Sequence, residues 1–214
     1  MRIDIWSDIV CPWCYLGARR LDAALDRLEW GDEVEIVWRA YQLDPSASDE
    51  PGELRRAIER KYGPGAFDSM ADRLTALGAD VDIDYRFDRA LRVNTFAGHR
   101  LMAWALTHGP QRQSALGDRL FRAYFTDGEN IADQVRLRRL AGEIGLDATE
   151  AGEVLDAGSF ADDVQRDLTA AAERSITAVP TFVIADRLAV PGAQDVDTMV
   201  SLLERARDRL ATDA

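Results

Sequence analysis

The sequence predicts an α/β fold whose sheet-forming domain is interrupted by an inserted all-helical subdomain. Strand-like patterns occur only near the two ends of the chain, whereas residues 45–156 show helix starts and stops and almost no convincing strand. The length of 214 residues, 47% of them hydrophobic, is enough for one sizeable core with an inserted subdomain. We therefore expect residues 1–44 and 157–214 to form one discontinuous domain and residues 45–156 to form the insertion.

The first elements are predicted to be a strand, a helix and a second strand. Residues 2–6 alternate isoleucine with polar residues, and residues 34–40 are rich in β-branched and aromatic residues, so both predict strands. Between them, apolar residues recur at helical spacing over residues 14–28, and Gly31 follows as a helix-ending residue. Because a helix connects the two strands, we expect them to be parallel neighbours.

The middle of the chain predicts a succession of helices. Asn94 is expected to cap a helix that ends at Gly109-Pro110, and Ser159 is expected to cap a later helix that reaches residue 174. Further helices are predicted at residues 54–61, 66–77, 111–125 and 133–144, with a short one after Asp147.

Strands return near the C-terminus. Residues 181–184 and 188–190, joined by a turn, predict an antiparallel hairpin, and residues 196–210 predict a final helix. Without the insertion, the predicted order is strand, helix, strand, helix, strand, strand, helix. This is the element order of a thioredoxin-like fold.

The two cysteines of the chain lie in one motif, Cys11-Pro12-Trp13-Cys14, at the start of the first predicted helix. A spacing of three residues in a helical turn places both sulfurs on one face, where a disulfide can join them. Pro12 suits the first helical position, so Cys11 lies at the helix N-terminus, where unpaired N–H groups stabilise a thiolate. We therefore predict thiol–disulfide exchange, with Cys11 as nucleophile and Cys14 as resolving thiol.

Two alternatives exist for such a cysteine pair: two buried cysteines without function, which the strand-motif-helix context disfavours, and half of a zinc site. Tetrahedral zinc needs four ligands, and His99 and His108, far along the chain, are the two conventional nitrogen donors available. We therefore predict neither a metal nor a resident cofactor, and we consider glutathione as a redox partner only.

Charge and cysteine use restrict the partners and the compartment. With 38 acidic and 26 basic residues, the net charge of -12 disfavours nucleic acid and anionic membranes as partners. The N-terminus is charged and no long uncharged apolar run occurs, so neither a signal peptide nor a membrane span is predicted. A single local dithiol then fits a cytoplasmic protein best. The oligomeric state is not indicated.

A second feature agrees with the redox interpretation. Pro180 stands at the entry of a predicted strand, where a proline either lies at a sheet edge or follows a cis bond. In the thioredoxin architecture this proline faces the dithiol. If the Val179-Pro180 bond is cis, the Val179 backbone groups are free to pair with an extended substrate peptide.

Linked motifs carry a family resemblance that spans residues 3–205. The motifs are Ser7-Asp8-x-x-Cys11-Pro12-Trp13-Cys14-Tyr15-x-Gly17, Asn94-x-x-x-x-His99-Arg100 and Val179-Pro180-x-Phe182-Val183, followed by Gly192-Ala193-Gln194. Together they resemble the FrnE-like group of the DsbA family, thioredoxin-like thiol–disulfide oxidoreductases with a helical insertion. The resemblance implies oxidoreductase or isomerase activity on disulfide-containing proteins or small thiols, with Cys11 attacking, Cys14 resolving and Pro180 as the cis-proline.

The resemblance also motivates roles for residues outside the dithiol. Asn94, His99 and Arg100 are expected to line the cleft between the insertion and the dithiol. There, Arg100 or a protonated His99 would stabilise the Cys11 thiolate. The alternative for His99 is a hydrogen-bonded core histidine.

Two further residues are assigned to substrate contacts. Trp13 is expected to offer apolar surface to substrates, although large aromatic residues belong to the core more often. Gln194 is expected to hydrogen-bond a peptide-like ligand. Asp8, which precedes the motif, is interpreted first as a structural turn residue.

Two other functions stay open at this point. The same fold includes kappa-class glutathione transferases and 2-hydroxychromene-2-carboxylate isomerases, which typically carry a serine where this chain has Cys11. The transferases also have Gly-Ser-Asp where this chain has Gly192-Ala193-Gln194. A protein that binds hydrophobic clients is the other alternative, because the predicted helix at residues 95–108 is apolar around most of its girth.

Overall fold

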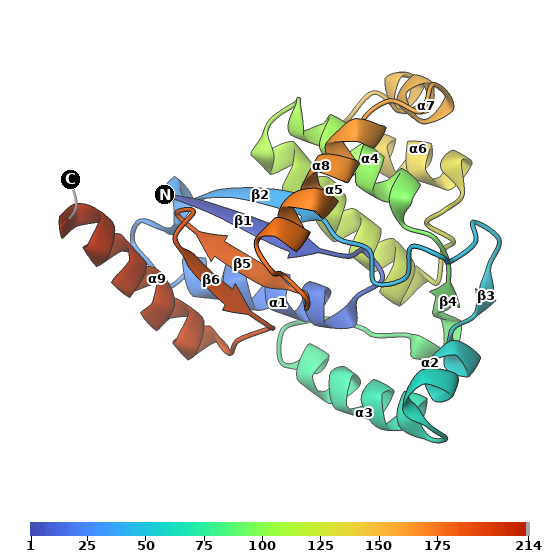
Figure 1. Cartoon of the computed structure of the whole chain (residues 1–214), viewed down its shortest axis with the longest axis horizontal. Helices are drawn as coiled ribbons and strands as arrows, with labels where there is room; N and C mark the ends of the chain where they lie inside the picture. The colour runs from blue at the N-terminus through green and yellow to red at the C-terminus, as the bar shows by residue number, and fades with distance from the viewer. Residues whose placement is uncertain (213–214) are drawn as a thin grey trace.

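The computed structural model describes residues 1–212, and its elements follow the predicted order (Figure 1). The main elements are β1 (Arg2–Ser7), α1 (Pro12–Leu25), β2 (Glu35–Ala40), β3 (Gly52–Glu53), α2 (Leu54–Tyr62), α3 (Ala66–Ala79), β4 (Leu91–Arg92), α4 (Phe96–Leu106), α5 (Pro110–Arg122), α6 (Gln134–Glu143), α7 (Ala148–Asp156), α8 (Ala161–Glu173), β5 (Thr181–Ile184), β6 (Leu188–Pro191) and α9 (Val196–Thr212). Short helical turns occupy Gly31–Glu33, Phe87–Arg89 and Ala123–Asp127. Among these described helices, none combines the length and the hydrophobicity needed to span a membrane.

The central sheet has four strands in the order β2-β1-β5-β6. β1 and β2 are parallel, with Ile3 paired to Ile36 and Ser7 to Ala40. β5 runs antiparallel to both β1 and β6. The predicted parallel pair and the predicted hairpin are therefore confirmed, and β1 lies at the centre of the sheet with its C-terminal end next to α1.

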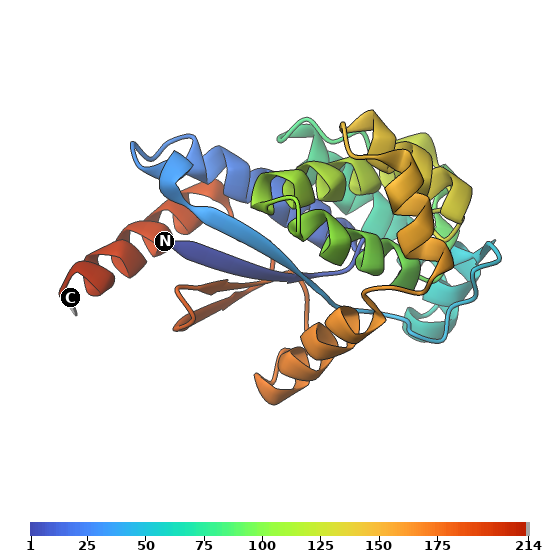
Figure 2. The same cartoon turned by 90° about the horizontal axis from the view of Figure 1, so that it is seen from above.

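Helices cover both faces of this sheet (Figure 2). Ile3 and Ile5 of β1 belong to a buried cluster with α1 and α9, because alternate side chains of a strand point to the same face. Trp6 and Val183 pack on the opposite face, together with Ala171 of α8. This gives the layered arrangement of a thioredoxin-like fold, with the helical insertion between β2 and β5.

The insertion packs directly on α1. One continuous hydrophobic cluster contains Leu16 of α1, Leu101 of α4, Leu120 of α5, Leu140 of α6 and Leu155 of α7. Burial of these side chains supplies the main driving force that holds the insertion against the dithiol helix. The boundaries proposed at residues 45 and 156 stay predictions.

The first helix is shorter than predicted. α1 ends at Leu25 rather than at residue 28, because the chain continues in tight turns: the Leu28 N–H donates to the Leu25 carbonyl at 3.0 Å, and the Gly31 N–H donates to the Leu28 carbonyl at 2.9 Å. A Cβ at Gly31 would lie 2.1 Å from the Leu25 carbonyl oxygen, so only glycine fits there. The apolar spacing thus continued past the helix into these turns.

Three further details of the structure also differ from the prediction. The helix predicted at residues 111–125 is divided into α5 and a π-helical turn, Ala123–Asp127. β3 and β4 form an antiparallel pair of two residues each, which is too short to leave an alternating pattern in the sequence. The predicted Ser159 cap is wrong: α8 begins after Phe160, which has a φ of 62°, and no side chain caps it.

Candidate active site at the start of α1

The Cys11-Pro12-Trp13-Cys14 segment begins α1 directly after the end of β1. Cys11 precedes the helix with extended backbone angles, and its N–H donates to the Asp8 carbonyl at 3.0 Å. Pro12 occupies the start of the helix, where no N–H donor is needed. The Cys11 carbonyl accepts the Cys14 N–H at 3.0 Å, so one tight turn brings the two cysteines together.

The two cysteines have different environments. Both are buried free thiols, and the Cys11 thiol donates to the Val179 carbonyl at 3.7 Å. Burial raises the pKa of Cys14 well above its usual value, and the hydrogen bond with Cys11 raises it further, against smaller opposite effects of the Ser7 hydroxyl and the Asp8 N–H. Cys14 therefore holds its proton firmly, as suits a thiol that reacts second.

Pro180 lies against the same helix, on the side of α1 where β5 begins. The Val179-Pro180 peptide bond is cis, as the family resemblance implied. A Cβ at Gly17 would lie 2.9 Å from Pro180 Cγ and 3.2 Å from Phe182 Cζ, so this glycine lets the loop before β5 approach α1 closely. Segments from the two ends of the chain therefore meet at the dithiol.

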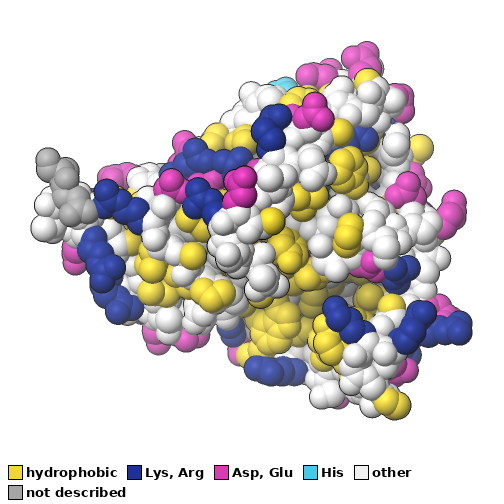
Figure 3. Space-filling view, viewed as in Figure 1, with side chains coloured by type: hydrophobic (Ala, Val, Ile, Leu, Met, Phe, Trp, Pro, Cys, Tyr) yellow, Lys and Arg dark blue, Asp and Glu magenta, His cyan; other side chains and the backbone are white. Residues whose placement is uncertain are grey.

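Apolar side chains surround the dithiol. Val10, Trp13 and Val179 are half-buried and pack against the hydrophobic cluster that contains both cysteines. Hydrophobic side chains gather in a hollow above α3 on this face of the molecule (Figure 3). The Arg73 guanidinium of α3 lies over the Trp13 ring, with Cζ 5.2 Å from the ring centroid. A substrate that reaches Cys11 would meet this apolar surface. The contact of a substrate with Trp13 stays a prediction.

A buried hydrogen-bonded pair joins the end of β1 to α4 near Cys14. His99 Nε2 lies 3.3 Å from Asp8 Oδ1, and Asp8 Oδ2 accepts the Leu43 N–H at 2.8 Å. Asp8 is 0% exposed and His99 is 6% exposed, so water screens their interaction little. The sequence singled out both residues but not their pairing, because they lie on different elements.

Arg100 makes its hydrogen bonds between α7 and α8. Its Nε donates to the Ser159 carbonyl at 2.7 Å, and its Nη2 donates to the carbonyls of Val154 and Leu155 at 2.6 and 3.0 Å. A guanidinium at a helix C-terminus satisfies free carbonyls and complements the helix dipole. Within residues 1–212, no hydrogen bond links this guanidinium to a cysteine sulfur, and its predicted role toward the thiolate stays a prediction.

Asn94 and Gln194 also hydrogen-bond to nearby backbone groups. The predicted cap is misplaced by one residue, because the N-cap of α4 is Thr95; Asn94 Oδ1 nevertheless accepts the Phe96 N–H at 2.8 Å, and its Nδ2 donates to the Ala47 carbonyl at 2.9 Å. Gln194 Nε2 donates to the Pro191 carbonyl at 2.7 Å. These contacts hold loops in place, and the proposed substrate contacts of both residues stay predictions.

Tyr85 belongs to the site, although no pattern in the sequence identified it. Its hydroxyl donates to the Pro12 carbonyl at 2.5 Å, from a position 73 residues further along the chain. A contact between such distant segments leaves no local periodicity. The available signal was the pair of aromatic residues Tyr85 and Phe87 in an otherwise charged loop.

A separate cavity of about 630 Å³ lies on the α8 side of the sheet, among α4, α5 and α8. Trp6, Arg39 and His99 contribute to its lining, whereas neither cysteine does. Arg39 is paired there with Asp4 at 2.7 Å and with Asp167 at 3.3 Å. In the described part of the chain, no group of three or more His, Cys, Asp or Glu side chains is placed to hold a metal.

Comparison with known proteins agrees with this geometry. A model of the DSBA-like thioredoxin domain matches residues 2–204. The uncharacterized protein YwbO of Bacillus subtilis (strain 168) is 30% identical over 199 residues, which cover 92% of each chain. The crystal structure of probable DsbA oxidoreductase SCO1869 from Streptomyces coelicolor is 36% identical, with a TM-score of 0.90 over 97% of this chain and 90% of that chain.

A more distant structure shows how widely the fold is shared. The structure of a 2-hydroxychromene-2-carboxylate isomerase is 16% identical, with a TM-score of 0.68 over 100% of both chains. That likeness concerns the fold alone. The family model, in contrast, spans nearly the whole chain, including the dithiol and the cis-proline. The chain therefore belongs to the DsbA-like thioredoxin domain family and is a thiol–disulfide oxidoreductase.

Proposed function

We propose that Cys11 is the attacking sulfur of this oxidoreductase and that Cys14 resolves the mixed disulfide. The contrast between the two positions supports this assignment most directly. Cys11 precedes the helix, where free N–H groups stabilise a thiolate. Cys14 lies within the first turn, where burial raises its pKa well above the usual value. Because burial keeps Cys14 protonated, we assign the first attack to Cys11.

In the reducing direction, the Cys11 thiolate attacks one sulfur of a substrate disulfide. A bond forms between Cys11 and that sulfur, and the other substrate sulfur leaves as a thiolate, which takes up a proton. Cys14 then loses its proton and attacks Cys11 Sγ, so that the second substrate sulfur leaves and the Cys11–Cys14 disulfide forms. The substrate gains two electrons and the protein loses two. Oxidation of a substrate dithiol is the same sequence in reverse.

The substrates that fit this site are disulfides in extended polypeptide segments or the disulfides of small thiols such as glutathione. Half-buried apolar residues surround the dithiol, and the Val179 carbonyl lies beside Cys11. An extended chain can lie along such a loop as an added strand. We place the protein in the FrnE-like group of the family on the basis of its linked sequence motifs. We also place it in the reducing cytoplasm, because both of its cysteines belong to the dithiol motif.

Substitution of each cysteine tests the assignment. We expect Cys11→Ser to abolish insulin reduction and to form no mixed disulfide with a cystine peptide. Cys14→Ser should accumulate a stable mixed disulfide through Cys11, visible as a mass increase that dithiothreitol removes. Accumulation of the adduct in Cys11→Ser instead would reverse the two roles, and unchanged turnover in both variants would exclude dithiol chemistry.

The reduction potential provides a second test. The Pro-Trp dipeptide lacks the histidine that helps to make DsbA strongly oxidising, so we expect a less oxidising couple. DsbA has a potential of about -120 mV. Equilibration with glutathione buffers of known ratio measures the value for Cys11 and Cys14. A potential as high as that of DsbA would contradict the expectation.

A further inference from the structure

Tyr85 reaches the first turn of the dithiol helix from the insertion. It lies between α3 and β4, and it is 4% exposed. Its hydroxyl donates to the Pro12 carbonyl at 2.5 Å. Pro12 is the first residue of α1 and lies between the two cysteines in the chain. The phenol therefore contacts the turn that carries both cysteines.

The Tyr85 ring is held in this orientation by its neighbours. It stacks on Phe87 with centroids 5.0 Å apart, and it meets Phe125 edge to face at 5.3 Å and Tyr15 edge to face at 6.0 Å. Gly78 leaves room for the ring, because a Cβ there would lie 2.6 Å from Tyr85 Cδ2. A ring fixed on several sides places its hydroxyl at one position, so little entropy is lost in making the hydrogen bond.

Electrostatics couple this phenol to the dithiol. Burial raises the pKa of Tyr85, and negative charge on Cys11, Tyr15 and Cys14 raises it further. The hydroxyl therefore stays protonated and remains a donor. Because the phenol is neutral, it acts on the dithiol through its O–H dipole and its hydrogen bond to the Pro12 carbonyl rather than through a charge.

We propose that Tyr85 is a positioning residue that stabilises the reduced, thiolate form of the dithiol through the Pro12 carbonyl. The O–H dipole offsets the partial negative charge of a carbonyl next to Cys11, and it fixes the turn in which Cys14 lies. A stabilised reduced form makes a dithiol couple more oxidising, as DsbA shows. The insertion thereby adjusts the redox chemistry of the thioredoxin-like domain. This inference deepens the proposed function, on which it rests.

Tyr124 provides a matched control for Tyr85. It is 1% exposed, its ring meets Phe125 edge to face at 4.7 Å, and its hydroxyl donates to a backbone carbonyl, that of Leu91. Burial raises the pKa of Tyr124 as well, together with the charge of Asp8, but neither cysteine contributes. Tyr85→Phe and Tyr124→Phe each remove one buried donor of the same kind, and only the first touches the dithiol turn.

The experiment measures the equilibrium constant between the Cys11–Cys14 pair and glutathione for the parent and both variants. We expect Tyr85→Phe to shift this constant toward the disulfide by three- to tenfold, which corresponds to about 14 to 30 mV. Tyr124→Phe should change it by less than twofold. Iodoacetamide alkylation of Cys11 at neutral pH should also be slower in Tyr85→Phe than in Tyr124→Phe. The midpoint of thermal unfolding confirms that both variants are folded.

Equal shifts in the two variants, or no shift in Tyr85→Phe, would overturn the proposal. Failure of the proposed function would look different. A parent protein that reaches equilibrium with glutathione and yet leaves insulin and cystine peptides unreduced would contradict the proposed substrates. The comparison of Tyr85 with Tyr124 would still decide the role of Tyr85, because that readout needs only the two cysteines.

Discussion

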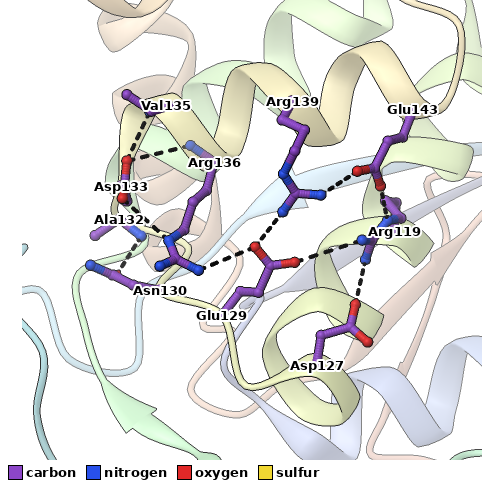
Figure 4. Close-up of polar contacts among 10 residues, drawn as sticks. All are labelled: Arg119, Asp127, Glu129, Asn130, Ala132, Asp133, Val135, Arg136, Arg139 and Glu143. Carbon is purple, nitrogen blue, oxygen red and sulfur yellow. Dashed lines mark hydrogen bonds and ion pairs between the residues drawn. The ribbon is translucent and has the colours of Figure 1, made fainter.

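Two groups of polar contacts made by the insertion differ in the part of the molecule to which they connect it. The dithiol-side contacts are those of Tyr85 with the start of α1 and of His99 with the end of β1. The ion-pair network lies around α6 and is shown in Figure 4, with the charged residues Arg119, Asp127, Glu129, Asp133, Arg136, Arg139 and Glu143. The first group joins the insertion to the redox turn, whereas the network joins parts of the insertion to one another.

Burial separates these two groups further. The dithiol-side contacts are almost fully buried, so each lost partner leaves a polar group without water to replace it. Arg136 and Arg139 of the network are 46% and 45% exposed, so solvent and salt weaken their interactions. We therefore expect substitutions in the first group to change both stability and redox equilibrium, and substitutions in the network to change stability slightly and the redox equilibrium not at all.

The largest effect is expected for His99→Ala. The substitution removes the partner of a fully buried carboxylate and leaves Asp8 with the Leu43 N–H as its side-chain contact. Removing the hydrogen-bond partner of a buried carboxyl group costs about 3 kcal/mol of unfolding free energy, measurable by urea denaturation. Because the Asp8 backbone N–H lowers the pKa of Cys14, a displaced Asp8 should also shift the equilibrium with glutathione.

A double-mutant cycle with Asp8→Asn checks this explanation. If the loss in His99→Ala comes from the unpaired carboxylate, removal of the Asp8 charge should recover part of it, with a coupling of about 1 to 2 kcal/mol. Strictly additive losses would show that the two side chains act independently. An unchanged glutathione equilibrium in His99→Ala would remove this residue from the dithiol-side contacts.

Arg100→Ala is expected to have the next largest effect on stability and no effect on the dithiol. The substitution removes three hydrogen bonds from a charged donor, to the carbonyls of Val154, Leu155 and Ser159, which costs about 2 to 3 kcal/mol although the first two carbonyls still accept backbone N–H groups. The glutathione equilibrium should equal that of the parent. A shift toward the disulfide would instead support the role toward the Cys11 thiolate that the motif suggested.

Local patterns explain which elements were predictable. The four strands of the central sheet, α1 and the helices from α2 to α9 leave periodic signals within a few residues, and the order of these signals predicted the fold. The end of α1 was misplaced because the apolar spacing continues into the turns that lead to Gly31. The start of α8 was misplaced because Phe160 adopts a positive φ that its residue type does not suggest.

The residues of the site also fall into those that local patterns predict and those that they do not. Cys11, Cys14 and Pro180 could be predicted because two short motifs contain them. The pairing of Asp8 with His99 and the contact of Tyr85 with Pro12 could not, because each joins segments that are far apart in the chain and close only after the insertion has packed on α1. Distant contacts of this kind carry the effects that distinguish one member of a fold from another.

Substitutions at two glycines, one beside the dithiol-side contacts and one in the helix of the ion-pair network, test the two groups of contacts directly. A Cβ at Gly78 would lie 2.6 Å from the Tyr85 ring, whereas a Cβ at Gly142 in α6 would meet the Ala148 Cβ at 3.3 Å. Gly78→Ala is expected to lower the unfolding free energy by about 2 kcal/mol through overpacking. It should also shift the glutathione equilibrium in the same direction as Tyr85→Phe.

Gly142→Ala is the matched control for this substitution. The gain in helix propensity offsets a mild contact, so stability should stay within about 1 kcal/mol of the parent. The glutathione equilibrium should not change. If Gly78→Ala left that equilibrium unchanged while lowering stability, the ring position of Tyr85 would not matter to the dithiol.

The smallest effect is expected for Glu129→Gln, at the centre of the network. Glu129 is 14% exposed and pairs with Arg119 at 3.7 Å, with Arg136 at 3.4 Å and with Arg139. Neutralising it should cost about 1 kcal/mol at low ionic strength and clearly less in 1 M salt, because salt screens the exposed arginines. The glutathione equilibrium should match that of the parent at both ionic strengths. A salt-independent loss accompanied by a redox shift would mean that the network also reaches α1 and that the two groups of contacts act as one.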